Sequence, residues 1–137
     1  MKGIDTNVLV RYIVQDDAQQ SASATHFLEK ECTLTSPAFI GGIVLCELVW
    51  VLETAYEYSR QEIVSVLECI LKIRQFHLHE PDILWQTLQG YAQGRADFAD
   101  HYIMRLNHHF GCAMTLTFDK KAAKLPFAEL LTNRDIK

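Results

Sequence analysis

The sequence predicts an α/β protein, specifically a three-layer α/β/α sandwich around a central parallel sheet of four or five short strands. Two patterns in the 137 residues support this fold class. Short β-compatible runs alternate with longer amphipathic runs of helical period. The runs between the strands are also long enough to form the helical crossovers that parallel strands need. By length, residues 1–137 form a single domain with room for one hydrophobic core.

The first half of the chain opens with a strand that ends at Asp5 and turns directly into a helix. Pro37 suits the first turn of a long helix that ends near Tyr58. Ser59 and Glu62 have the spacing of a capping box, which starts the next helix. The elements expected here are helices at about 8–14, 18–30, 37–58 and 59–73, with a short β-like run at 32–36.

The second half repeats the alternation and ends in strands. Gly94 closes one helix, Asp97 opens the next, and Asp119 ends a strand of strong β character. The expected elements are strands at 76–80, 112–118 and 127–131, helices at 82–93 and 97–110, and a helical turn at 120–124.

The charge balance argues against a general, salt-driven nucleic-acid binder. The net charge is −4, from 13 Lys and Arg against 17 Asp and Glu. An acidic metal site can dominate that total while a local basic rim meets phosphates, and a basic excess does occur between Lys120 and Lys137. A solvated surface explains that excess equally well. The chain has no signal-peptide pattern and no apolar run of bilayer length, so we expect a cytoplasmic protein without a membrane segment.

Carboxylates occur at places that the local pattern does not fully explain. Asp5 and Asp119 end strands, Asp97 and Asp100 lie at a helix N-terminus, and Glu47 falls among apolar residues of the long helix, on what we expect to be its buried face. In a parallel sheet, strand ends and the N-termini of the following helices share one edge. The sequence therefore predicts that these acids converge.

Converging carboxylates need a cation. Two unit charges about 4 Å apart repel by roughly 4 kcal/mol at an effective dielectric near 20. All-oxygen ligands favour Mg²⁺ or Mn²⁺, and such an ion activates water against a phosphodiester. Asp119 is a candidate to position that water, and Thr6, Asn7, Thr115 and Thr117 are candidates to orient a ligand or a water.

Each acid also has a simpler interpretation. Asp5 or Thr6, Asp97 and Asp119 can all be helix caps, and for Asp97 capping is the preferred interpretation. Glu47 has the weakest alternative of this kind, because an ionised Glu among Val, Ile and Trp is costly unless it is paired.

Four segments together resemble the PIN domain family, in particular its VapC-type ribonuclease toxins. They read IDTNVL at 4–9, LCELVWVL at 45–52, FADHYI at 98–103 and TFDK at 117–120. The resemblance implies that Asp5, Glu47, Asp100 and Asp119 hold Mg²⁺ or Mn²⁺ and cut RNA, with Asp97 as an accessory acid. It also implies a homodimer and a small antitoxin whose C-terminal segment covers the acidic pocket.

The chain departs from this family after Asp100. It reads His101-Tyr102-Ile103-Met104 where the toxins usually have small residues. The leading hypothesis is a metal-dependent endoribonuclease toxin, with Arg11, Arg95, Arg105, Lys120 and Lys121 as candidates for an RNA-binding rim. The alternatives are a non-catalytic PIN-like module that binds RNA or protein and, less favoured, a phosphatase whose first strand ends in D-x-D, a motif that Asn7 interrupts here.

Overall fold

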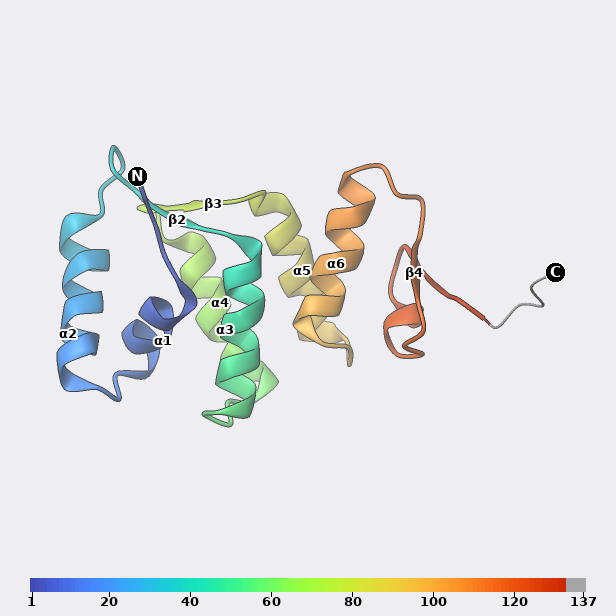
Figure 1. Cartoon of the computed structure of the whole chain (residues 1–137), viewed down its shortest axis with the longest axis horizontal. Helices are drawn as coiled ribbons and strands as arrows, with labels where there is room; N and C mark the ends of the chain where they lie inside the picture. Colours follow the sequence, from blue (N-terminus) through green and yellow to red (C-terminus); the bar gives the residue numbers. More distant parts are fainter. Residues whose placement is uncertain (133–137) are drawn as a thin grey trace. The chain divides into compact units, whose positions relative to one another are not determined.

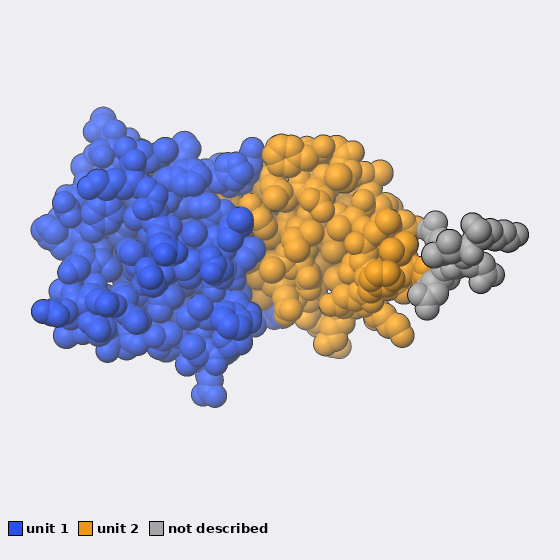
Figure 2. Space-filling model, viewed as in Figure 1, with its two compact units in different colours: residues 1–81 blue, residues 82–137 orange. Residues whose placement is uncertain are grey.

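The computed structural model describes residues 1–132, which form two compact units. Unit 1 comprises Met1–Pro81, and the described part of unit 2 comprises residues 82–132 (Figure 2). Arg134 and Lys137, which belong to the basic segment predicted near the C-terminus, lie outside the described residues. Each unit is described by itself below.

Unit 1 is a three-stranded parallel sheet with helical connections (Figure 1). The strands lie in the order β1-β2-β3, and Gly3, Phe39 and His77 are neighbours across them. The chain runs in order through β1 (Lys2–Gly3), α1 (Thr6–Val14), α2 (Ala18–His26), a π-helical turn η1 (Phe27–Glu31), β2 (Ala38–Ile40), α3 (Gly42–Thr54), α4 (Arg60–Lys72) and β3 (Phe76–Leu78).

Unit 2 contains two helices followed by a parallel strand pair. Leu116 of one strand lies opposite Glu129 of the other. The elements are α5 (Pro81–Gln93), α6 (Phe98–His109), β4 (Thr115–Thr117), a 3-10 turn η2 (Ala122–Lys124) and β5 (Ala128–Leu130).

The predicted α/β class, the parallel pairing and the short strands are confirmed. The strands are divided between a three-stranded and a two-stranded sheet, whereas the sequence predicts one central sheet. Strands of two or three residues offer few backbone groups for pairing, and their sequences do not specify which neighbour they meet. The division into sheets is therefore set by tertiary pairing.

The predicted strand at 32–36 and the helix start at Pro37 are wrong. Residues 33–36 form a turn, in which the Thr33 amide donates to the Ser36 carbonyl. Pro37 precedes β2, whose Ala38 amide donates to the Gln75 carbonyl, and α3 begins at Gly42. The apolar run after Pro37 suits a strand or a helix by local pattern, and its pairing between β1 and β3 decides for the strand.

The buried face of α3 also differs from the prediction. Leu45, Leu48, Val49 and Leu52 are buried, whereas Ile43 is 73% exposed and Trp50 is 67% exposed. Glu47 lies on the exposed side with them. Because α3 is apolar around most of its circumference, its sequence does not reveal which side packs inward. Glu47 is therefore not an ionised group buried among Val, Ile and Trp.

Several local signals are confirmed by the structure. Ser59 and Glu62 form the capping box, with the Glu62 amide donating to Ser59 Oγ at 3.1 Å and the Ser59 amide donating to Glu62 Oε1 at 3.0 Å. The core of unit 1 includes Leu9, Ile40 and Leu48, and that of unit 2 includes Leu84 and Tyr91. Within residues 1–132, none of the helices has the length and apolar character required to traverse a lipid bilayer.

Candidate active site

Unit 1 holds two of the candidate carboxylates, which Thr6 connects. Asp5 follows β1 and caps α1, because its Oδ1 accepts a hydrogen bond from the Thr6 amide at 2.7 Å. The Thr6 side chain is buried, and its Oγ1 donates to Glu47 Oε1 at 3.2 Å. The first turn of α1 is thereby joined to α3. Asp5 is exposed, so capping leaves part of its carboxylate open to solvent.

Unit 2 holds the other three acids, whose charges act on one another. Asp100 lies in the first turn of α6 and is partly buried. Its pKa is raised above the ordinary value, first by desolvation and then by the negative charges of Asp97 and Asp119. A hydrogen bond to the Asp97 backbone opposes the shift. Asp97 and Asp119 therefore lie near enough for their charges to act on the Asp100 carboxylate.

Asp97 does not act as the cap that the sequence favoured. It occupies the N-cap position of α6 with an extended backbone, but its side chain makes no capping hydrogen bond. The N-terminal amides of α6 do not hold this carboxylate, which leaves Asp97 exposed beside Asp100.

Asp119 is fixed by the turn that follows β4. Its Oδ1 accepts from the amides of Lys121 at 2.8 Å and Ala122 at 3.2 Å, and its own amide donates to Thr117 Oγ1 at 3.0 Å. Thr117 thus braces Asp119. The hydroxyl of Thr115 accepts a hydrogen bond from Asn107 Nδ2 of α6 at 3.0 Å.

The Asp100 pKa predicts how the stability of the metal-free protein depends on pH. A carboxyl whose pKa is raised on folding binds more protons in the folded state, so stability falls as pH rises from the ordinary Asp pKa through the raised one. We expect Asp100→Asn to raise the melting temperature of the EDTA-treated protein at pH 7 and to flatten that fall. Thermal melts between pH 3.5 and 7 measure this. A variant that melts below the wild type at pH 7 would contradict the assignment.

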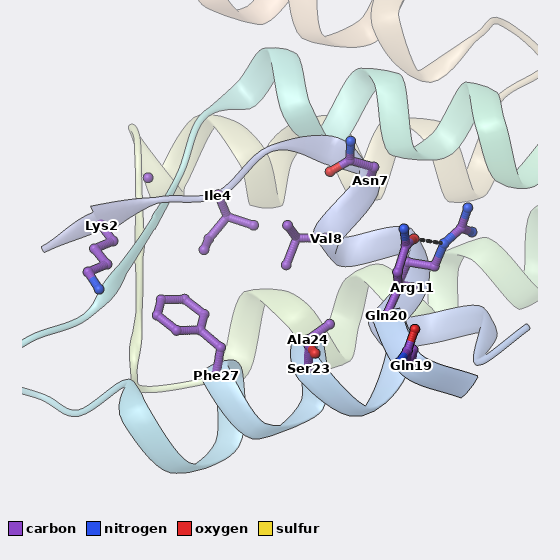
Figure 3. Close-up of a pocket in the computed structure, with 11 residues that line it drawn as sticks. Lys2, Ile4, Asn7, Val8, Arg11, Gln19, Gln20, Ser23, Ala24 and Phe27 are labelled. Carbon is purple, nitrogen blue, oxygen red and sulfur yellow. Dashed lines mark hydrogen bonds between the residues drawn. The ribbon is translucent and has the colours of Figure 1, made fainter. Parts of the chain in front are cut away.

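A groove of about 640 Å³ lies within unit 1, between β1, α1 and α2 (Figure 3). It is lined by the side chains of Lys2, Asn7, Arg11, Gln20 and Phe27, among others. None of the described residues that line it is acidic. In a chain of net charge −4, this groove is a surface suited to an anionic ligand.

The predicted rim residues fall into two groups. Arg11 lines the groove, but its guanidinium is shared with neighbours: Nη1 lies 3.1 Å from Asp16 Oδ1, and Nε donates to Gln20 at 2.7 Å. In unit 2, Arg95, Lys120 and Lys121 are exposed, and the two lysines directly follow Asp119. Arg105 instead lies over the Phe127 ring, 5.4 Å from its centroid.

The donor chemistry fits a hard divalent cation, because every candidate ligand is a carboxylate. Among the described residues, no three His, Cys, Asp or Glu side chains form a ready metal cluster. The five acids are instead divided, with Asp5 and Glu47 in unit 1 and Asp97, Asp100 and Asp119 in unit 2. The raised pKa of Asp100, caused first by desolvation and then by Asp97 and Asp119, is the feature that favours a bound cation.

Sequence reasoning missed the α2 wall of the groove. Gln20 and Ser23 of α2 and Phe27 of η1 line it at helical spacing. Their i, i+3 and i+7 pattern is visible in the sequence, but a stripe of two polar residues and one aromatic residue is ordinary for a helix face. Only the opposing β1 and α1 residues turn this stripe into the wall of a groove.

Comparison with known proteins agrees with the four-segment resemblance. The model of the PIN domain family matches residues 3–128. The chain is 24% identical over 127 residues to a VapC ribonuclease of Aquifex aeolicus (strain VF5), and the alignment covers 93% of each chain.

Proposed function

Because this chain belongs to the PIN domain family, we propose that it is a metal-dependent endoribonuclease and the toxin of a toxin–antitoxin pair. The raised pKa of Asp100 carries the proposal: desolvation and the charges of Asp97 and Asp119 disfavour its ionised form, and a bound Mg²⁺ or Mn²⁺ would compensate that charge. The VapC ribonuclease relative supports the toxin assignment.

The proposed catalytic carboxylates are Asp5, Glu47, Asp100 and Asp119, with Asp97 in an accessory role. Bound Mg²⁺ or Mn²⁺ would supply Lewis acidity and a more acidic water for attack on phosphorus. Asp119 orients that water, and Thr117 holds Asp119 through the backbone hydrogen bond. Thr6 positions Glu47 through the hydrogen bond between their side chains. This proposal treats residues 1–137 as one nuclease domain.

RNA would bind along the groove of unit 1 and at the rim of unit 2. Lys2 offers a cationic group to phosphates, and Arg11 would do so by exchanging its contact with Asp16 for a phosphate. Asn7 and Gln20 offer amides to base edges, and Phe27 offers a ring. Arg95, Lys120 and Lys121 are the proposed contacts in unit 2. The absence of acids from the described groove lining supports this assignment.

We extend the proposal to partners and location by analogy with the family. The protein would act in the cytoplasm as a homodimer, held inactive by a small antitoxin that covers the carboxylates. A cationic side chain of the antitoxin, such as Arg, would compensate their charge.

Incubation of purified, antitoxin-free protein with a mixed cellular RNA pool tests the function. We expect discrete cuts with Mg²⁺ or Mn²⁺, no cuts with EDTA, and recovery when the metal is restored in excess. Sequencing of the new RNA ends would identify the cleavage site. If the folded, metal-loaded protein binds RNA without cutting it, the non-catalytic binding module becomes the better description.

A further inference from the structure

His101 of α6 fills a notch that two glycines leave in unit 2. The side chain is 5% exposed. An added Cβ at Gly90 would lie 2.6 Å from His101 Nδ1, and one at Gly94 would lie 3.1 Å from Nε2. The first distance is shorter than real contacts allow, so the imidazole occupies space that any other residue at position 90 would take. His101 and Gly90 are therefore sterically matched.

Gly90 lies inside α5, where glycine is a costly choice. Glycine destabilises a helix interior by roughly 0.5–1 kcal/mol relative to alanine. The close approach of the imidazole explains why position 90 is glycine, since a side chain there would meet the ring. Gly90 and Gly94 are one helical turn apart, so both expose backbone without a side chain on the same side. The notch is thus a specific feature of how α5 and α6 pack.

The notch fixes the rotation of α6 about its own axis. Phe98, one turn before His101, packs edge-on against Tyr91 of α5 with ring centroids 5.6 Å apart. Phe98 and His101 therefore hold the first turn of α6 at two points. Asp100 belongs to that turn and is displaced by about 100° from its neighbour His101. A change in how His101 packs would turn the Asp100 carboxylate, together with the start of α6, relative to Asp119 after β4.

We propose that His101, seated in the Gly90–Gly94 notch, is a positioning residue for the Asp100 carboxylate. It acts through the orientation of α6 and contacts neither substrate nor metal. This inference rests on the proposed function, because it assigns Asp100 to the metal site. It also accounts for the departure of this chain from the small residues usual in the toxins. The bulk of His101 occupies the space that Gly90 and Gly94 leave because they have no side chains.

A double-mutant cycle tests the inference with a readout other than cleavage. The variants are His101→Ala, Gly90→Ala and the double substitution, and the probe is Mn²⁺ affinity measured by electron paramagnetic resonance. We expect each single variant to bind Mn²⁺ about 10- to 100-fold more weakly, the range typical for residues that orient metal ligands. The double variant should recover part of the affinity, because the methyl group added at position 90 no longer meets an imidazole.

Met104→Ala is the matched control. Met104 is also buried on α6 and lies one turn beyond both Asp100 and His101, so it tests whether any loss of packing next to Asp100 weakens metal binding. We expect Met104→Ala to lower the urea midpoint as much as His101→Ala does, while its Mn²⁺ affinity stays within about threefold of the wild type. If Met104→Ala loses Mn²⁺ affinity in proportion to its loss of stability, His101 has only a structural role.

The outcomes separate this inference from the proposed function. If the wild-type protein binds Mn²⁺ but cuts no RNA, the proposed nuclease activity is contradicted. The double-mutant cycle can still be measured in that case, because it depends only on Mn²⁺ affinity. Wild-type Mn²⁺ affinity in Gly90→Ala and His101→Ala, or the lack of any wild-type Mn²⁺ binding, would overturn the inference. If His101→Ala does not fold, the Mn²⁺ affinity of Gly90→Ala still tests the inference, because this variant keeps the imidazole and changes only the notch that it occupies.

Discussion

RNA cleavage should fall by at least about 100-fold in the Asp5→Asn variant, with the fold retained. The substitution removes one negative charge from the proposed metal ligands. Residues that merely orient a ligand already account for about 10- to 100-fold in metal affinity, and loss of a ligand charge should cost no less. Asparagine is also a good N-cap, so it can keep the hydrogen bond from the Thr6 amide that Asp5 now accepts. Initial rates on one identified RNA site, with Mn²⁺ in excess, measure the effect.

Asp17→Asn is the control for Asp5→Asn. Asp17 caps α2 as Asp5 caps α1, since its Oδ1 accepts from the Gln20 amide at 2.8 Å. The two substitutions remove the same charge from the same kind of cap, but only Asp5 belongs to the proposed metal site. We expect Asp17→Asn to cleave within about twofold of the wild type. Equal losses in both variants would trace the effect to capping or net charge and would remove Asp5 from the catalytic set.

Leu48→Ala should destabilise the protein by about 2–5 kcal/mol, the cost of emptying a well-packed leucine site. Leu48 is 0% exposed on the inward side of α3. The total stability of a domain is roughly 5–15 kcal/mol, so this one change removes a large share of it. Urea unfolding followed by circular dichroism gives the free energy of unfolding.

Ile43→Ala is the paired control on the other side of α3. Ile43 is 73% exposed, so its truncation should change the unfolding free energy by no more than about 0.5 kcal/mol. The contrast tests the rotation of α3, on which the exposure of Glu47 depends. If Ile43→Ala costs as much as Leu48→Ala, the sequence-based expectation that Ile43 lies on the buried face of α3 was correct, and Glu47 is flanked by buried neighbours.

Local signals predicted most elements well, because they act within a few residues. The Ser59 and Glu62 capping box, the helix that follows Asp97 and the strand before Asp119 all rest on neighbours along the chain. The carboxylates were visible for the same reason, as acids at strand ends and helix starts. Each could be identified without knowing what lies opposite it.

Signals that depend on distant partners failed or were ambiguous. Pro37 was assigned to the start of a helix from its local pattern. That pattern does not show the pairing of β2 with β1 and β3, which involves residues about 35 positions away in either direction. The prediction that Glu47 lies on the buried face of α3 was wrong. Because α3 is apolar around nearly its whole circumference, only packing selects its buried side.

The sequence by itself determined the α/β class, most of the helices, the strand before Asp119 and the identity of the candidate acids, because these follow from local periodicity and capping. The tertiary structure alone decided three further features: the bond between Thr6 and Glu47, the mutual charge of Asp97, Asp100 and Asp119, and the seat of His101 between two glycines. All three depend on contacts between separate elements, and short-range sequence patterns carry no record of which elements meet.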